Sequence, residues 1–293
     1  GRFARVGLAD MAGGVQARET IELGDFARTR DLSPLAAAIR RMCAAANGAP
    51  VLGVCIGFPA NLDPDAAAIV SYAAMDIQQP TSFAQVFPAF WREVELPVYL
   101  ENDANLACEG EAFLRRGAGG AANMLYLSIG SGCGGAVRLD GKLRRGARCR
   151  AGEVGAMLLQ PALGAPGRSA ARETLEDAVC LAALERRFGA ALRDGAQPGE
   201  ASAQAMRDYL CGPLSGAVYS LVMTLDVELC VLAGIVPGAL GMQLCTQVSE
   251  ALRAALPEST PVRVEPSVSA DAGVIGAAAT VFERSLDALL GSG

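Results

Sequence analysis

Residues 97–105 read Pro-Val-Tyr-Leu-Glu-Asn-Asp-Ala-Asn, and this stretch decides the fold class. An apolar strand over Pro97–Glu101 ends directly on Asn102 and Asp103, and a helix is predicted from about Ala104 to Arg116. In an open α/β sheet, polar groups at the carboxyl end of a strand face the crevice in which ligands bind. The stretch therefore predicts an α/β protein with a ligand site at this junction of strand and helix.

Asp103 has two interpretations. Backbone amides and the dipole at a helix N-terminus favour an ionised carboxylate, so Asp103 can simply cap the helix. The same carboxylate suits phosphoryl transfer, which needs a proton acceptor only as the attacking hydroxyl becomes acidic. Because the chain has no histidine, imidazole catalysis and histidine metal ligation are excluded, and any proton acceptor is a carboxylate, lysine, thiolate or phenolate.

The segments on either side of this junction alternate between strand and helix. Upstream, two strands over Arg2–Asp10 and Val15–Leu23 form a hairpin, a helix follows over Leu35–Ala46, and the apolar run Val51–Phe58 is typical of a strand buried on both faces. A further helix is predicted over Ser82–Arg92. Downstream, helices are predicted over Leu175–Phe188, Ala201–Leu225, Gly238–Leu256 and Ala272–Leu290, with short strands at Leu229–Leu232 and Val262–Val264.

The glycine-rich stretch Ser128–Gly135, between predicted strands Met124–Ile129 and Ala136–Leu139, matches G-x-G-x-x-G by letter. A dinucleotide fingerprint requires a helix after the glycines, whereas a strand is predicted here, which argues against a Rossmann site. A glycine turn between antiparallel strands can still direct backbone amides at a phosphate, with Ser131 adding a hydroxyl donor. An ordinary tight hairpin is the alternative.

Two further carboxylates are candidate ligands. Glu153 lies between glycines in Ala151–Gly155, where a ligand could approach the backbone closely, and a carboxylate accepts hydrogen bonds well from vicinal sugar hydroxyls. An exposed turn is the alternative for Glu153. Glu176 is ambiguous in the same way, because acidic residues cluster in solvated first turns of helices. Gly234 follows a short strand, where it could let a helix approach an adenine or merely let helices pack.

Composition bounds the function further. The net charge of −6 and the lack of a basic cluster argue against nucleic-acid binding. The longest apolar region, Gly216–Leu240, is interrupted by Asp226 and Glu228, so no membrane span is expected. The nine cysteines form neither paired spacings nor a CxxC clip, which is typical of reduced, buried thiols in a cytoplasmic protein.

Taken in order, these features resemble the ROK family of sugar kinases and repressors, within the actin-like, hexokinase-like ATPase superfamily. The resemblance runs from Arg2 to about Ala279 and also includes Gly57-Phe58-Pro59-Ala60, Asp140-Gly141, Asp271-Ala272-Gly273 and Gly276-Ala277-Ala278. It implies two ribonuclease-H-like α/β domains flanking a central cleft. Residues 1–107 would form the sugar-side domain, completed by a C-terminal helix over about 280–293, and residues 108–279 the nucleotide-side domain.

The resemblance also implies an ATP-dependent kinase that uses Mg²⁺ and phosphorylates a hexose, and it favours a homodimer. By motif, Asp103 is similar to the family's catalytic base. The other implied site residues are Asn102, Glu153, Glu176 and Gly57 on the sugar side, Ser131, Gly132 and Gly134 at the phosphates, and Gly234 at the adenosine.

Departures from the family pattern leave an alternative function open. The family's Asp-x-Gly-Gly-Thr motif would lie immediately before Arg2, Ala156 replaces the histidine after the Gly-Glu motif, and the Cys-x-Cys-Gly zinc segment before Glu176 is missing. We therefore expect no structural zinc and a less constrained loop over Pro161–Ser169. The alternative is a non-catalytic sugar-binding regulator; a DNA-binding repressor would need a helix-turn-helix before the first hairpin, which we do not expect.

Overall fold

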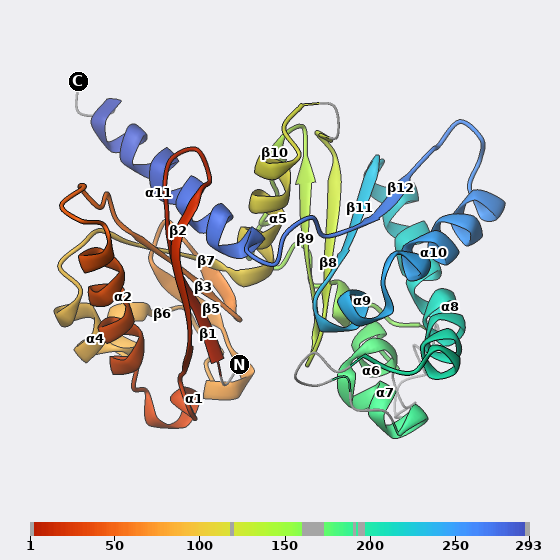
Figure 1. The fold of residues 1–293 in the computed structure, drawn as a ribbon, viewed down its shortest axis with the longest axis horizontal. Helices are drawn as coiled ribbons and strands as arrows, with labels where there is room; N and C mark the ends of the chain where they lie inside the picture. Colours follow the sequence, from red (N-terminus) through yellow and green to blue (C-terminus); the bar gives the residue numbers. More distant parts are fainter. Residues whose placement is uncertain (1–2, 118–119, 160–172, 190–191, 193–196, 291–293) are drawn as a thin grey trace. The chain divides into compact units, whose positions relative to one another are not determined.

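The computed structural model describes residues 3–117, 120–159, 173–189, 192 and 197–290 (Figure 1). It is an α/β protein, as the sequence predicts. The chain divides into two compact units: unit 1 comprises Gly1–Gly120, Gly146–Arg150 and Val268–Gly293, and unit 2 comprises Ala121–Arg145 and Ala151–Ser267. The predicted loop Pro161–Ser169 lies outside the described residues.

The described strands of unit 1 form three small sheets. Strands β1 (Phe3–Ala9) and β2 (Val15–Glu22) are antiparallel, β3 (Val54–Phe58) and β7 (Val98–Asn102) are parallel, and β4 (Asn61–Asp63), β5 (Ala68–Ser71) and β6 (Thr81–Ser82) form an antiparallel sheet. The helices of this unit are α1 (Phe26–Thr29), α2 (Ser33–Ala45), α3 (Phe83–Val86), α4 (Pro88–Glu93), α5 (Asp103–Leu114) and α11 (Ala272–Leu290), with a 3-10 turn η1 (Ala73–Met75).

An aromatic cluster around Phe58, the last residue of β3, lies in the core of unit 1. The Phe58 ring packs edge-on against Phe26, Tyr72 and Phe83, with ring centroids 5.3–5.7 Å apart. Because side chains alternate along a strand, burying Phe58 turns its neighbour Gly57 to the exposed side. The core thereby fixes which face of β3 is available to a ligand.

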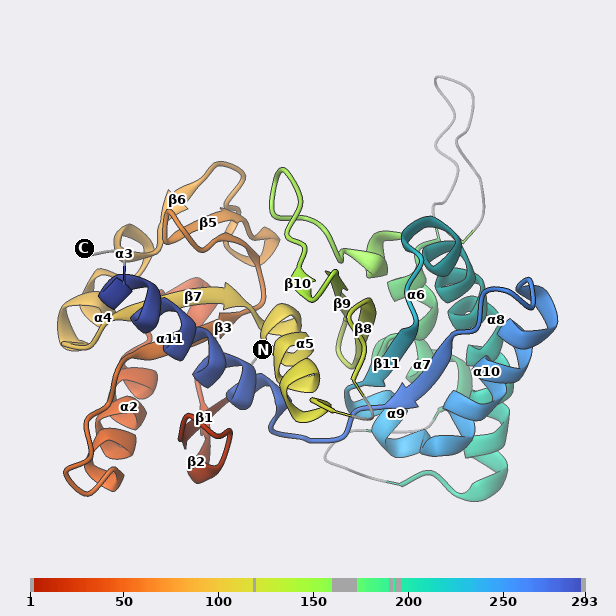
Figure 2. The ribbon, with the colours of Figure 1, turned by 90° about the horizontal axis from the view of Figure 1, so that it is seen from above.

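Helices α5 and α11 of unit 1 pack at backbone distance, side by side in both views (Figures 1 and 2). A Cβ at Gly110 would overlap the carbonyl oxygen of Ala272, and a Cβ at Gly276 would overlap that of Leu106. Only glycine leaves room for this approach. Since α5 begins at Asp103, the packing fixes the helix that carries the candidate base.

Unit 2 is built on a five-stranded sheet in the order β10-β9-β8-β11-β12. Its strands are β8 (Met124–Ile129), β9 (Cys133–Leu139), β10 (Lys142–Leu143), β11 (Leu229–Ala233) and β12 (Arg263–Pro266), and β8, β11 and β12 run parallel. All residues of β11 are buried, as expected for a central parallel strand. The described helices are η2 (Val154–Ala156), α6 (Leu175–Val179), α7 (Leu181–Phe188), α8 (Glu200–Leu225), α9 (Ile235–Leu240) and α10 (Met242–Ala255).

Three predicted helices are interrupted in the structure. The helix predicted over Ser82–Arg92 breaks at Phe87. Pro88 follows, and a proline disfavours helical geometry at the residue before it. The helix predicted from Gly238 breaks at Gly241, which has a φ of 71°. The helix predicted over Leu175–Phe188 breaks at Cys180, whose backbone is extended.

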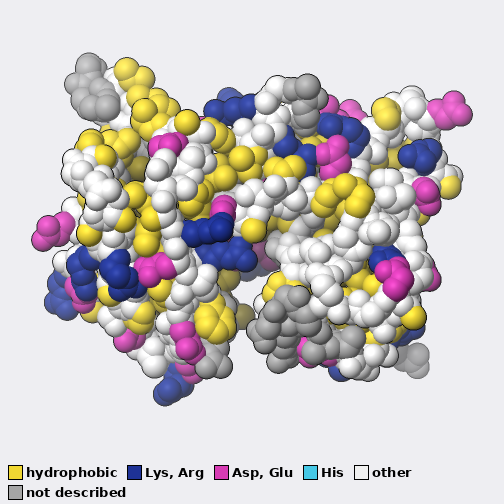
Figure 3. Space-filling model, viewed as in Figure 1, with side chains coloured by type: hydrophobic (Ala, Val, Ile, Leu, Met, Phe, Trp, Pro, Cys, Tyr) yellow, Lys and Arg dark blue, Asp and Glu magenta, His cyan; other side chains and the backbone are white. Residues whose placement is uncertain are grey.

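Charged side chains of both signs are interspersed on the face shown in Figure 3. On unit 1, exposed pairs such as Arg28 with Asp25, 3.0 Å apart, bring opposite charges together. Exposed pairs of this kind contribute only about 0–1 kcal/mol each. In the described part of the chain, no helix combines the length and apolar character needed to cross a bilayer.

Candidate functional site

The turn between β7 and α5 is organised by Asn102. Its Oδ1 accepts hydrogen bonds from the backbone N–H groups of Ala104, at 2.9 Å, and Asn105, at 3.1 Å, while its Nδ2 donates to the carbonyl of Ala60 at 3.2 Å. Asn102 is therefore the N-cap of α5. Asp103 is the first helical residue, so the helix does not depend on Asp103 for its cap.

Asp103 is exposed to solvent although the helix behind it is buried. Protein atoms around its carboxyl displace part of the hydration shell and raise the pKa above the ordinary value of 3.8, and the hydrogen bond from the Ala104 N–H, 2.9 Å from Oδ1, partly opposes this rise. The pKa of Tyr72 is raised as well, mainly by desolvation and secondarily by the Asp103 charge. Tyr72 is thus electrostatically coupled to the candidate base.

A buried carboxylate, that of Glu101, accepts hydrogen bonds from the turn between β7 and α5. Glu101 is 2% exposed, and its Oε1 accepts hydrogen bonds from the Asn102 backbone N–H at 2.9 Å and from Asn105 Nδ2 at 2.8 Å. This role of Glu101 is not among those predicted from the sequence. The available signal was an acidic residue at the end of an apolar strand, four residues before an asparagine at the start of a helix.

Gly57 lies beside Asp103, as the parallel pairing of β3 with β7 requires. Gly57 is opposite Glu101 in the register, and a Cβ at Gly57 would lie 3.4 Å from the Asp103 Cα. The structure therefore brings Gly57, Asn102 and Asp103 together in unit 1.

Ser71 is not among the residues predicted from the sequence. It accepts hydrogen bonds from Asn61 Nδ2 at 2.9 Å and from Arg150 Nη2 at 3.4 Å.

In unit 2, the glycine-rich stretch forms a turn shorter than predicted. Strand β9 begins at Cys133 rather than at the predicted Ala136, so Gly134 is already a strand residue. The Gly130 N–H donates to the Gly132 carbonyl at 2.8 Å, which closes the turn. Ser131 and Gly134 are exposed and Cys133 is buried. The segment Gly130–Gly134, called the phosphate loop below after the role that the sequence predicts for it, therefore has one side that faces solvent and one that faces the protein.

Glu176 contacts the protein-facing side of the phosphate loop. Its Oε2 accepts a hydrogen bond from the Cys133 backbone N–H at 2.7 Å. Burial raises the pKa of the Cys133 thiol to about 12, and the nearby Glu176 charge adds to this effect. No sequence signal connects residues so far apart in the chain.

The glycines around Glu153 and at position 234 lie where backbone segments of unit 2 approach each other closely. A Cβ at Gly155 would overlap the carbonyl oxygen of Cys133, and a Cβ at Gly152 would lie 3.0 Å from the Ala136 Cα. Gly234, with a φ of 94°, packs against the backbone of Ile129, the last residue of β8. The close approach is thus to the protein's own strands. These backbone contacts place the exposed Glu153 and the start of α9 around the phosphate loop.

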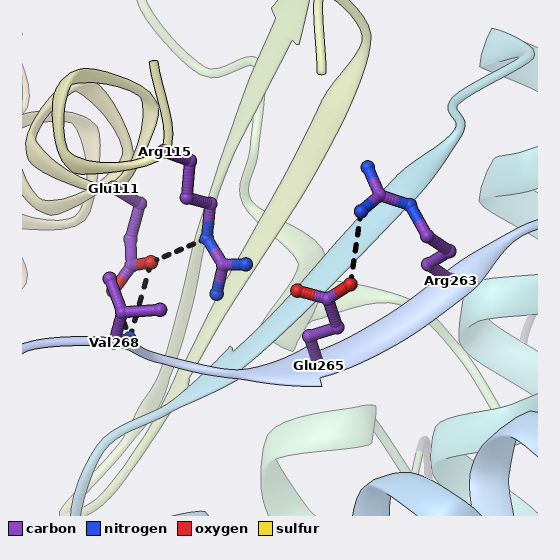
Figure 4. A network of polar contacts seen from close by, with 5 residues as sticks. All are labelled: Glu111, Arg115, Arg263, Glu265 and Val268. Carbon is purple, nitrogen blue, oxygen red and sulfur yellow. Dashed lines mark hydrogen bonds and ion pairs between the residues drawn. The ribbon is translucent and has the colours of Figure 1, made fainter. Parts of the chain in front are cut away.

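Figure 4 shows polar contacts in two other groups of residues, one in each unit. In unit 1, Glu111 Oε2 accepts from Arg115 Nε at 2.9 Å, and Glu111 Oε1 accepts from the Val268 backbone N–H at 3.0 Å. In unit 2, Arg263 Nη1 lies 3.1 Å from Glu265 Oε1 on β12. Across the described residues, no cluster of three or more Cys, Asp and Glu side chains could hold a metal ion.

Comparison with known proteins identifies relatives. A family model described as "ROK family" matches residues 4–284. A glucokinase of Halalkalibacterium halodurans is 34% identical over 141 residues, which cover 46% of this chain and 40% of that protein. The match thus spans less than half of that relative's length.

Solved structures match over nearly the whole chain. A ROK hexokinase from Thermus thermophilus superposes with a TM-score of 0.73 at 25% identity, covering 98% of this chain and 96% of that chain. A ROK family transcriptional regulator, a homolog of the E. coli MLC protein, has a TM-score of 0.75 at 17% identity and covers 99% of this chain and 77% of that one. The architecture is therefore shared by kinases and regulators alike. Because the family model spans almost all of the sequence, the chain belongs to the ROK family.

Proposed function

We propose that this protein is an ATP-dependent sugar kinase that transfers a phosphoryl group to a hydroxyl of a hexose. The observation that carries the proposal is the position of Asp103: it is exposed at the start of α5, its cap role is taken by Asn102, and its pKa is raised. A raised pKa makes an aspartate a better proton acceptor at neutral pH. The glucokinase and hexokinase relatives support this reading.

In the proposed mechanism, Asp103 accepts the proton of the sugar hydroxyl while the hydroxyl oxygen forms a bond to the γ-phosphorus and the bond to the ADP oxygen breaks. ATP would supply the phosphoryl group, and Mg²⁺ held by its phosphate oxygens would neutralise their charge. The exposed side of the phosphate loop, with the Ser131 hydroxyl and the backbone amide of Gly132, fits the negative charge of phosphates, and Gly134, which pairs with Ser128, would line the same side.

The remaining site residues are proposed with the roles that the family resemblance implies. We assign sugar contacts to Asn102, Gly57, Glu153 and Glu176, and the adenosine side to Gly234. Unit 1 would then be the sugar side and unit 2 the nucleotide side. For Asn102, only the second Nδ2 hydrogen remains for a sugar, because Oδ1 caps α5 and Nδ2 already donates to Ala60.

The test is a coupled assay of ADP release by the full-length protein over a panel of hexoses, with wild type, Asp103→Asn and Asp287→Asn. Asp287 is an exposed aspartate of α11 and serves as the matched control. We expect Asp103→Asn to lower kcat by about 10²- to 10⁴-fold with little change in the KM for sugar. Wild-type turnover in Asp103→Asn would remove this carboxylate from the mechanism.

The same experiment addresses the non-catalytic alternative. If calorimetry shows that the wild-type protein binds a hexose but no hexose in the panel promotes ADP release, the protein is a sugar-binding regulator and the kinase proposal fails.

A further inference from the structure

We propose that Glu176 is a positioning residue of the phosphate loop and that its two carboxylate oxygens couple sugar binding to nucleotide binding. This inference rests on the proposed kinase function and adds to it. The role carried over from the family resemblance is that of a sugar ligand alone. The geometry of unit 2 assigns Glu176 a second task, which is to hold the loop that would receive the phosphates.

The first support is the contact between Glu176 and the loop. The Glu176 Oε2 accepts the Cys133 N–H at 2.7 Å, a short bond typical of a charged acceptor. Cys133 is only 6% exposed, and a buried amide N–H without a partner is costly. A Cβ at Gly132 would lie 2.8 Å from the same oxygen, so a larger residue there would displace the carboxylate. The turn is therefore shaped to admit this carboxylate.

The second support is the rigidity of the element that carries Glu176. Helix α6 begins with a capping box in which Thr174 Oγ1 accepts the Asp177 N–H at 3.2 Å and Asp177 Oδ2 accepts the Thr174 N–H at 3.0 Å. Just beyond α6, the Leu181 N–H donates to the Gly130 carbonyl at 2.8 Å. The loop is thus bonded to the α6–α7 segment at both ends of its turn, while Ser131 remains exposed.

The coupling follows from the second oxygen of the carboxylate. Glu176 is exposed, and among the described residues its Oε1 accepts no hydrogen bond. A sugar hydroxyl that donates to Oε1 would fix the orientation of the carboxylate and, through Oε2, the direction of the Cys133 amide and the turn before it. Nucleotide binding would then lose less conformational entropy in ordering the loop. By linkage, the nucleotide would strengthen sugar binding by the same factor.

The experiment measures the affinity for MgADP by calorimetry, without sugar and with saturating glucose or, if glucose is not a substrate, the hexose with the highest turnover in the panel. We expect glucose to tighten MgADP binding to wild type by about 5-fold or more. Glu176→Ala should weaken MgADP binding without sugar by about 5- to 20-fold and abolish the tightening by sugar.

Matched variants separate a loop role from a general loss of structure. Glu176→Gln keeps an acceptor for the Cys133 N–H, so its sugar-free MgADP affinity should stay within about 3-fold of wild type. Gly132→Ala should reproduce the weakening seen in Glu176→Ala, because its Cβ displaces the carboxylate. Glu173→Ala removes an exposed carboxylate just before α6 and should leave MgADP binding unchanged.

Two results would overturn the inference. If Glu176→Ala binds MgADP like wild type in the absence of sugar and loses only sugar affinity, Glu176 is a sugar ligand and nothing more. If sugar tightens MgADP binding equally in wild type and Glu176→Ala, the coupling runs through other residues. Failure of the kinase proposal is distinguishable, because wild type would then release no ADP with any hexose in the panel.

Discussion

At the scale of single residues, the candidate base depends on its neighbour. Asn102 provides the cap that α5 needs, so the exposed Asp103 carboxylate is not required as the cap and is available for the proposed proton transfer. Beneath both lies Glu101, which fixes the Asn102 amide and the Asn105 side chain. The position of the Asp103 carboxylate therefore depends in part on Glu101, to which no sugar contact is assigned.

Replacing the cap should reduce both stability and turnover. Asn102→Ala removes the acceptor of the Ala104 and Asn105 amides, and we expect a loss of about 0.5–2 kcal/mol in the free energy of unfolding together with a lower kcat. Denaturant unfolding and steady-state kinetics measure the two effects. Asn102→Ser keeps a capping oxygen and loses only the donor to Ala60, so its stability should stay closer to wild type. Equal destabilisation in both variants would contradict the capping role.

The raised pKa of Asp103 predicts a pH dependence of activity. A base works when ionised, so kcat/KM should fall as the pH falls through the pKa of Asp103, and this acid limb should lie above the ordinary value of 3.8. A pH–rate profile with the best hexose measures it. An acid limb at or below 3.8 would show that the shift does not operate in the working enzyme.

Stability should depend on pH in the corresponding sense. Because the pKa is raised in the folded state, the Asp103 contribution is most favourable below the unfolded pKa and is lost as the pH rises through the folded pKa. Asp103→Asn cannot ionise and should gain stability relative to wild type across that window, with no gain below it. Unfolding in denaturant at several pH values, with Asp287→Asn as control, tests the sign.

At the scale of secondary-structure elements, α5 is fixed by its contact with α11. Gly110→Ala should disrupt this contact, since its Cβ would overlap the Ala272 carbonyl, and overpacking costs about 1–3 kcal/mol or more in unfolding free energy. Because α5 carries Asp103, kcat should fall as well. Gly273→Ala on α11 points into open space and should be neutral or stabilising by up to about 1 kcal/mol. A similar loss of stability in both variants would contradict the packing argument.

The elements also show what the sequence can and cannot predict. The junction of β7 with α5 can be predicted from the sequence, because an apolar run ends on polar residues at the point where helical periodicity begins. Pro88 and Gly241 interrupt predicted helices because local backbone chemistry outweighs periodicity. The sequence singles out the glycines around Glu153 and Gly234 as points of close approach, but only the fold reveals that Gly155 approaches β9 and Gly234 approaches β8. The contact of Glu176 with Cys133 depends on tertiary packing alone.

At the scale of the whole molecule, each unit gathers its own part of the candidate site. Unit 1 brings Gly57, Asn102 and Asp103 together at the end of β3 and β7. In unit 2 the phosphate loop, Glu176 and Gly234 lie around the ends of β8 and β11. The proposed kinase function assigns the proton acceptor to one unit and the phosphate contacts to the other, which is why the proposal needs both.

The anchoring of Val268 has a consequence for how the molecule tolerates changes in length. Val268 is the first residue of the last segment of unit 1, and its amide donates a hydrogen bond to Glu111, whose carboxylate is paired with Arg115. An inserted residue in the loop between Leu256 and Val262 can bulge outward harmlessly. The same insertion between Val268 and Ala272 would slide α11 along α5, bringing bulkier positions opposite the carbonyls that the two glycines now accommodate.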